Sequence, residues 1–104
     1  MSTRTIYVTT GSRDEGLAIG RELVEARLAA CANVLAGATS IYRWQGEVHE
    51  DTEAIVVLKT REGLVDALVE RVKALHNYDC PCVVALPIVG GNAKYLDWIV
   101  KETS

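Results

Sequence analysis

The sequence predicts one α+β domain of four strands and three helices, on three observations. The length of 104 residues suits a single domain covering residues 1–104. Along the chain, segments in which hydrophobic residues recur every two residues, as in strands, alternate with segments in which they recur every 3.6 residues, as in helices. No internal repeat, linker or low-complexity segment interrupts this alternation. Apolar residues make up 49% of the chain, so a domain this small is expected to bury some of them against other subunits.

A strand and a helix are predicted at the start of the chain. Residues 5–10 are mostly β-branched or aromatic, which is typical of a strand. Ser12 and Glu15 have the spacing of a helix N-terminal capping box. Apolar residues then recur at helical spacing opposite a charged face, which predicts an amphipathic helix over residues 13–28.

A long hairpin follows this helix. Residues 33–44 form its first predicted arm, and Gly37 within it indicates a bulge or bend. Residues 45–46 (Gln-Gly) are a turn, and residues 48–60 form the second arm. Each arm has about twelve residues, which is longer than the core of so small a domain can cover.

The rest of the chain contains a helix, a strand and a last short helix. Apolar spacing predicts a helix over residues 64–75, with Thr60 as its candidate N-cap. Residues 83–89 are predicted to be a strand, and Pro87 indicates an edge position because proline donates no hydrogen bond. After a glycine-rich turn, the apolar residues within 96–100 predict a short C-terminal helix.

The element order is therefore βαββαβ followed by a helix. With right-handed crossovers, this order most simply gives a ferredoxin-like split βαβ sheet with helices on one face. The fourth strand lies on an edge in that topology, in agreement with Pro87.

Charge and hydropathy exclude two classes of partner. The net charge is −3 and no segment is rich in Lys or Arg, so no nucleic acid is expected as a partner. The longest apolar run, residues 83–89, is far too short to span a bilayer, so no membrane is expected either.

Cysteine usage and missing motifs predict a cytoplasmic protein that is not an enzyme. Three cysteines, without a signal-peptide pattern, argue against a disulfide framework. Cys31 is expected to pack between the first helix and the second strand, with a redox thiol as the alternative. Phosphate-binding GxxxxGK[ST] and nucleophile GxSxG motifs are absent, and only two histidines are present.

The strongest candidate metal ligands are His76, Cys80 and Cys82. Imidazole and thiolate are the ligands that copper and zinc prefer. Cys80 and Cys82 flank a proline, and residues two apart on an extended chain point to the same side, so both sulfurs could reach one ion. The alternative is that Cys82 opens a buried strand as a small apolar residue, while His76 interacts with the helix dipole.

Tyr42 and Trp44 are candidate subunit-interface residues. They share one face near the hairpin turn, and a four-stranded sheet has two edges that invite pairing. The alternative is that they are ordinary half-exposed aromatics on a single sheet.

Four polar residues alternate along the second hairpin arm: Glu47, His49, Asp51 and Glu53. In a regular strand they share a face, where their oxygens could hold a hard divalent cation. The favoured interpretation is a solvated hairpin tip whose acids also discourage aggregation.

Six segments together resemble one known family. They are Ala30-Cys-Ala-Asn33, Ser40-Ile-Tyr-Arg-Trp-Gln-Gly-Glu47, Leu58-Lys-Thr-Arg61, Ala74-Leu-His-Asn-Tyr-Asp-Cys-Pro81, Ala85-Leu-Pro-Ile88 and Tyr95-Leu-Asp-Trp98. In this order and spacing the chain resembles the CutA family of divalent cation tolerance proteins. The resemblance implies the ferredoxin-like fold and a homotrimer like that of PII signalling proteins, with the hairpin reaching the neighbouring subunits. It also implies a role in tolerance of copper and other divalent metals.

The resemblance also bears on individual residues. It favours His76 as a ligand, whereas Asn77 replaces the usual proline and Cys82 stands where an acid is common. Some members bind copper through a cysteine at the end of the first strand, where this chain has Thr9.

A second candidate site follows from the resemblance. It places Lys59, Thr60 and Tyr78 near a cleft between subunits, where a lysine could receive a small anion, as in a PII-like sensor. The alternative for Lys59 is an ion pair with an acidic residue. For the whole protein, a structural scaffold trimer is a third hypothesis beside metal binding and anion sensing.

Overall fold

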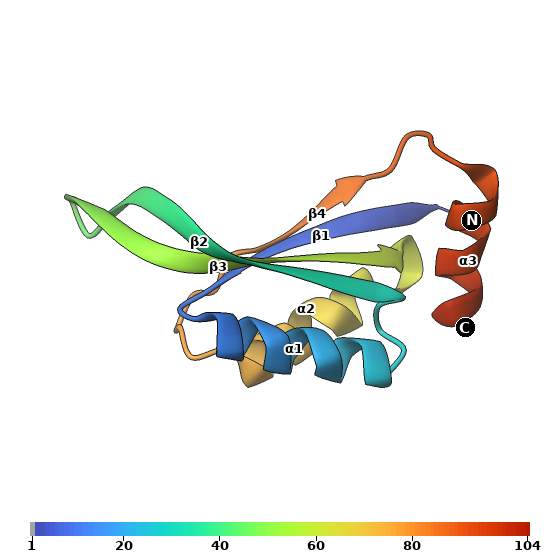
Figure 1. The fold of residues 1–104 in the computed structure, drawn as a ribbon, viewed down its shortest axis with the longest axis horizontal. Helices are drawn as coiled ribbons and strands as arrows, with labels where there is room; N and C mark the ends of the chain where they lie inside the picture. Colours follow the sequence, from blue (N-terminus) through green and yellow to red (C-terminus); the bar gives the residue numbers. More distant parts are fainter. Residues whose placement is uncertain (1) are drawn as a thin grey trace.

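The computed structural model describes residues 2–104, and its elements follow the predicted order. They are β1 (Thr3–Thr10), α1 (Arg13–Glu25), β2 (Cys31–Trp44), β3 (Glu47–Arg61), a 3-10 turn (Glu62–Leu64), α2 (Val65–Leu75), β4 (Val83–Pro87) and α3 (Ala93–Glu102). The strands form one antiparallel sheet in the order β2-β3-β1-β4, which confirms the ferredoxin-like prediction. Helices α1 and α2 lie against the same face of the sheet, and α3 stands at the end away from the hairpin turn (Figure 1).

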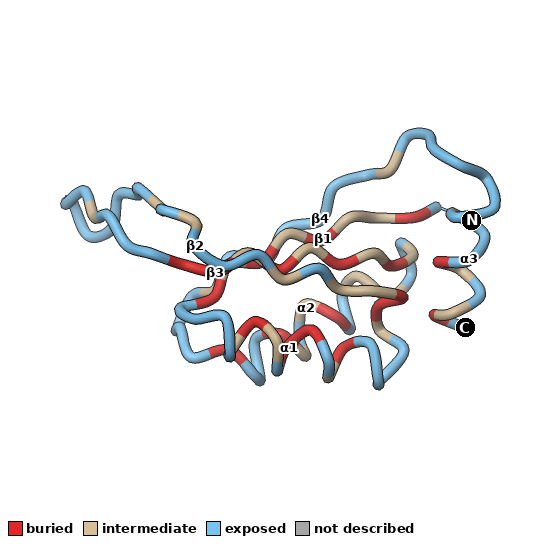
Figure 2. Tube along the Cα trace, in the orientation of Figure 1, coloured by how far each residue is buried: buried red, intermediate tan, exposed pale blue. Residues whose placement is uncertain are grey.

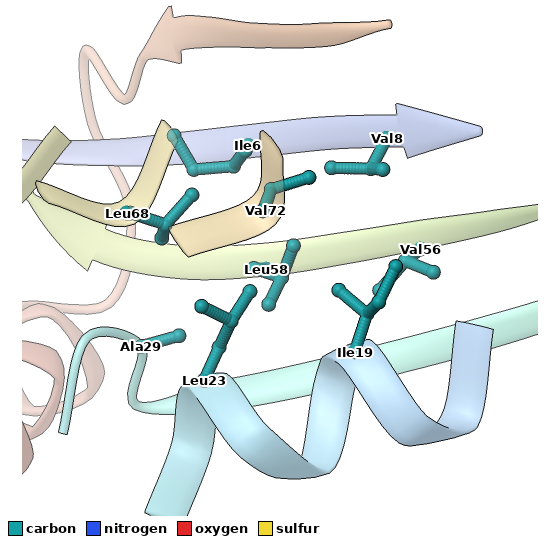
Figure 3. Packing of buried hydrophobic residues seen from close by; sticks show 9 residues of the cluster. All are labelled: Ile6, Val8, Ile19, Leu23, Ala29, Val56, Leu58, Leu68 and Val72. Atoms are coloured by element: carbon teal, nitrogen blue, oxygen red, sulfur yellow. The ribbon is translucent and has the colours of Figure 1, made fainter. Parts of the chain in front are cut away.

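The core lies between the sheet and the helices α1 and α2. Alternate residues of β1 and β3 point towards the helices and are fully buried (Figure 2). The helices contribute residues at helical spacing to the same cluster (Figure 3). The cluster comprises Ile6, Val8, Ile19, Leu23, Ala29, Val56, Leu58, Leu68 and Val72. The periodic hydrophobic residues of β1, β3, α1 and α2 therefore converge on one face of the sheet.

The opposite face of the sheet is not covered by α1 or α2, and it is apolar. Leu35, Val84 and Leu86 are 52%, 50% and 49% exposed. Val84 pairs with Tyr7 and Leu86 with Thr5, so these side chains share the face turned away from the two helices. We call this surface the uncovered face.

The hairpin of β2 and β3 extends beyond the body of the sheet, and the molecule measures 43 × 25 × 23 Å. The predicted bulge is confirmed, because Leu35 pairs with Ile55 and Ala38 with Glu53, which leaves an extra residue in β2. Gly37 has φ +82° there, a conformation that glycine adopts without strain. At the turn, Gln45 and Gly46 both have positive φ, as a type I′ hairpin turn requires.

Helix α1 ends earlier than predicted, at Glu25 rather than at residue 28. Arg27 has φ +59°, and the amide of Leu28 donates to the carbonyl of Leu23 at 2.9 Å. These are the features of a Schellman motif, which normally places glycine where Arg27 stands. The apolar spacing continued past the true end of the helix, and no glycine marked it.

The prediction of Thr60 as a helix N-cap was wrong. Thr60 is fully buried within β3, and its hydroxyl donates to the carbonyl of Leu28 at 2.7 Å. The strand continues to Arg61, and a 3-10 turn separates it from α2, which begins without a side-chain cap. A core contact was thus mistaken for a cap.

Strand β4 lies on an edge, as Pro87 predicted, but it ends at Pro87 rather than at residue 89. Pro87 faces Arg4 at a position that needs no amide hydrogen, because the amide of Ile88 donates to the carbonyl of Thr3. Asn92 then caps α3 by accepting a hydrogen bond from the amide of Lys94 at 3.1 Å.

Candidate functional site

A cleft of about 540 Å³ lies on the uncovered face, where the hairpin leaves the sheet and the loop after α2 runs beside it. Its walls are aromatic, acidic and thiol side chains from β2, β3 and that loop. They include Tyr42, Trp44, Tyr78, Glu53, Asp79, Cys80 and Cys82. The elements that bring them together are far apart in sequence, so the cleft is a product of the fold.

The hairpin supplies one wall through alternate residues of β2. The ring of Tyr42 stacks on that of its cross-strand partner His49, with centroids 5.5 Å apart. The Tyr42 hydroxyl donates a hydrogen bond to Asp51, and this bond raises the pKa of Tyr42 above its usual value. The aromatic face of the hairpin is therefore held in place by the polar residues beside it.

The predicted face-sharing of the four polar residues on β3 is confirmed by the pairing. Glu47 pairs with Trp44, His49 with Tyr42 and Asp51 with Ser40. Across residues 2–104, however, no three His, Cys, Asp or Glu side chains are grouped closely enough to hold a metal ion. Asp51 and Glu53 instead accept hydrogen bonds from tyrosines.

His76 sits beneath the cleft as a buried anchor. Its side chain is fully buried, and Nε2 lies 2.7 Å from the carbonyl oxygen of Thr9. The amide of Tyr78 donates to Nδ1 at 3.0 Å. These contacts assign the proton to Nε2, and both ring nitrogens already have partners. The loop that begins at His76 is thus fixed to the end of β1.

Glu15 joins the same loop to the first turn of α1. Its carboxylate accepts from the amides of Gly11 at 3.0 Å and Asn77 at 2.9 Å. The amide of Glu15 donates to the Ser12 hydroxyl, so the predicted cap forms while the Glu15 side chain reaches further than a capping box requires. A proline in place of Asn77 could not donate this bond.

Tyr78 forms the floor of the cleft together with Glu53. The Tyr78 hydroxyl donates to Glu53 Oε2 at 2.8 Å. Burial and this hydrogen bond raise the pKa of Tyr78 to about 12. Sequence reasoning placed Glu53 only among the hairpin acids, and no sequence signal paired it with Tyr78 across 25 residues.

The three cysteines are free and occupy two places. Cys80 and Cys82 are exposed and line the cleft together, whereas His76 does not join them. Cys31 was expected between the first helix and the second strand, which is wrong. Its neighbour Ala32 faces α1 at Gly20, while Cys31 Sγ lies 3.5 Å from the hydroxyl of Tyr95, whose pKa this contact raises.

Lys59, Thr60 and Tyr78 are not brought together within one chain. Six positions of β3 separate Lys59 from Glu53, the partner of Tyr78, which amounts to roughly 20 Å at the rise of a strand. Lys59 instead pairs with Cys31 and Thr5 on the uncovered face. The buried hydroxyl of Thr60 is taken up by the bond to Leu28.

Comparison with known proteins gives the family. The family described as CutA1 divalent ion tolerance protein matches residues 4–102. The chain belongs to the CutA1 family. Its fold agrees with that of a CutA1 protein of Thermus thermophilus, with a TM-score of 0.95 and 49% identity over 98% of this chain and 99% of the other. The CutA of Xylella fastidiosa gives a TM-score of 0.96 at 36% identity over the whole of both chains.

Relatives of this CutA1-family chain occur in bacteria and plants. The Thermus thermophilus divalent-cation tolerance protein CutA is 51% identical over 98 residues, covering 94% of this chain and 95% of the relative. A chloroplastic CutA of Oryza sativa is 47% identical over 94% of this chain. The chain spans about half the length of this relative and of the one from Arabidopsis thaliana. Between residues 2 and 104, no helix is long and apolar enough to cross a membrane.

Proposed function

We propose that this CutA1-family chain is a homotrimeric protein of metal tolerance that binds copper or another divalent metal. The observation that supports metal binding is the joint exposure of Cys80 and Cys82 on one cleft. Two thiolates suit Cu(I), since soft sulfur ligands select that ion. His76 would become a ligand only by giving up its bond to Thr9 or to Tyr78.

Titration with Cu(I) in competition with a chromophoric chelator tests the metal site. We expect one tight equivalent per chain, lost in the double variant Cys80→Ser with Cys82→Ser. Cys31→Ser is the matched control, because Cys31 lies elsewhere in the fold beside Tyr95. Binding that survives the double variant would refute the assignment to these thiols.

The homotrimer is supported by the uncovered face and by the hairpin. Leu35, Val84 and Leu86 are about half exposed in a single chain, which is a costly arrangement for side chains of that size. Tyr42 and Trp44, at 41% and 51% exposure, lie on the part of the hairpin that projects from the body. Both sheet edges, β2 and β4, are also free to pair among the described residues.

Light scattering after size exclusion tests the assembly. We expect a mass of three times the 11.3 kDa chain. Leu86→Lys, on the uncovered face, is expected to shift the mass towards the monomer, whereas Glu70→Lys on the exposed side of α2 is not. A monomer before any substitution would refute the trimer.

A PII-like sensor of a small anion is the second candidate, and Lys59 favours it. Lys59 is half-buried on the uncovered face, and no carboxylate lies within ion-pair distance of it among residues 2–104. An anion such as citrate should then raise the melting temperature without metal, and Lys59→Ala should abolish the effect. Lys101→Ala is the matched control. If neither copper nor anions stabilise the trimer, the result would support the third hypothesis, a structural scaffold.

Two further properties belong to the same proposal. The family is described by tolerance of divalent ions rather than by a reaction, and we propose that the chain catalyses none. We also propose a cytoplasmic location, which three free cysteines support because reducing compartments keep thiols unpaired. The names of relatives include chloroplastic and periplasmic, so fractionation of cells is the test.

A further inference from the structure

Glu53 and Lys59 are two charged residues of β3 that have no ionic partner within the chain. Glu53 is 8% exposed, and among the described residues its carboxylate accepts a hydrogen bond only from the hydroxyl of Tyr78. Lys59 is half-buried, and neither residue takes part in the ion pairs between residues 2 and 104. Because burial of a charge is unfavourable unless the charge is paired, each side chain would gain from an opposite charge.

The two side chains cannot neutralise each other within one chain. β3 is regular from Ala54 to Arg61 in its pairing with β1, so alternate residues from Glu53 to Lys59 share the uncovered face. Along the strand the two charged residues lie roughly 20 Å apart, which exceeds the combined reach of a lysine and a glutamate side chain. The partner of each must therefore come from outside the chain.

The surface between the two charges is apolar. Ile55 and Val57 lie between Glu53 and Lys59 on the same face of β3, and both are half-buried in a single chain. This stripe has a negative end, an apolar middle and a positive end. A second copy of the chain presents the same stripe, so its positive end is complementary to the negative end of the first copy.

We propose that Glu53 forms an ion pair with Lys59 of the partner subunit at each contact of the homotrimer. The inference rests on the proposed homotrimer, and it adds which charges meet and that the copies are arranged head to tail. Each copy gives its Glu53 to one neighbour and its Lys59 to the other, as a heterologous contact that closes into a ring requires. Glu53 keeps its bond to Tyr78, because a carboxylate offers about four lone pairs to donors.

One ion pair between copies satisfies both charges at once. A free cation bound at Glu53 would leave Lys59 unpaired, and a free anion bound at Lys59 would leave Glu53 unpaired. The pair joins the base of the hairpin of one copy to the opposite end of the sheet of the next. An anion at Lys59, as in the sensor hypothesis, would then have to displace a carboxylate of the neighbouring copy.

A double-mutant cycle on the full chain tests the pair. Glu53→Gln keeps an acceptor for Tyr78 but removes the negative charge, and Lys59→Gln removes the positive charge. Each single variant leaves one unpaired charge at the contact, so we expect it to lower the melting temperature by about 5 °C or more at a fixed chain concentration. The double variant leaves no unpaired charge and should melt no lower than either single variant.

The cycle separates failure of the pair from failure of the homotrimer. Additive losses in a protein with the mass of a trimer by light scattering would overturn the pair alone, since residues this far apart in one chain are not coupled. Any other mass of the unmodified protein would overturn the homotrimer on which the pair rests. Glu53→Gln combined with Lys101→Gln is the control, because Lys101 is an exposed residue of α3. The same coupling with Lys101 would indicate a general charge effect and would also refute the pair.

Cross-linking of the unmodified protein tests the pair even if Glu53→Gln does not fold. Unlabelled chains and chains labelled with heavy nitrogen are refolded together and treated with a carbodiimide, which takes up water as carboxylate and amine join in an amide. We expect a link from Lys59 to Glu53 that combines the two isotopes. Lys73 and Glu70, which lie 3.1 Å apart in one chain, are the control and should link only within one isotope. If the control link forms and the mixed link does not, the proposal is wrong.

Discussion

Replacement of His76 by alanine should destabilise the fold far more than its place at the end of a helix suggests. The substitution removes the ring that bonds the carbonyl of Thr9 at 2.7 Å and the amide of Tyr78 at 3.0 Å. Each buried partner left unsatisfied costs about 1–3 kcal/mol, and the substitution leaves two part-buried partners without the ring. We therefore expect a loss of about 3 kcal/mol in the free energy of unfolding.

Urea denaturation followed by tryptophan fluorescence measures this loss. The protein concentration must be held constant, because an oligomer's stability depends on it. His49→Ala is the matched control: His49 stacks on Tyr42 on the hairpin, and its loss should cost at most about 1 kcal/mol. A change below about 1 kcal/mol in His76→Ala would refute the role of His76 as an anchor.

Three other perturbations test the local arguments. The pKa of Tyr78 is raised from 10.0 to about 12, so the stability that this group contributes is complete below pH 10 and is lost as the pH rises towards 12. In Tyr78→Phe, the melting temperature should therefore fall less steeply over this pH range. An unchanged pH profile of the melting temperature would contradict the bond to Glu53. Gly37→Ala should lower the free energy of unfolding by about 1–2 kcal/mol, measured by urea denaturation, because Gly37 has a φ of +82°. Steric contact adds nothing to this cost, since no atom lies within 4 Å of the added carbon. Gly63→Ala, which is equally open but has no positive φ, should cost less. Asn92→Ala should cost about 1 kcal/mol by loss of the α3 cap, measured by thermal unfolding, and a neutral result would mean that the cap contributes nothing.

The sheet could be predicted because its determinants are local and repetitive. The two-residue period of the strands, Pro87 at an edge, and the glycines at the bulge and the turn each leave a mark in the sequence. Helix ends were harder, because Arg27 adopts a conformation that sequence reasoning reserves for glycine.

The site was harder still, because its contacts join residues far apart in the chain. The bonds from Tyr78 to Glu53 and from Asn77 to Glu15 span 25 and 62 residues, and nothing in the local pattern selects these partners. His76 was predicted as a metal ligand, with a cation at the end of the helix as the alternative, and neither interpretation foresaw that the contact with Thr9 at the end of β1 buries its side chain. Cys80 and Cys82 line one cleft, as their spacing predicted, since residues two apart on an extended segment share a side, and their role as metal ligands stays a prediction.

The bulge in β2 determines which side chains of the hairpin face the cleft. Leu35 before the bulge and Tyr42 after it would lie on opposite faces of a regular strand, yet the extra residue turns both to the same side. Deletion of Gly37 alone would restore regular pairing and leave Tyr42 and Trp44 on the side of the cleft, because Leu35 and Tyr42 would then be an even number of residues apart. The bulge therefore allows this arm of the hairpin to lose one residue without changing which of its side chains face the cleft.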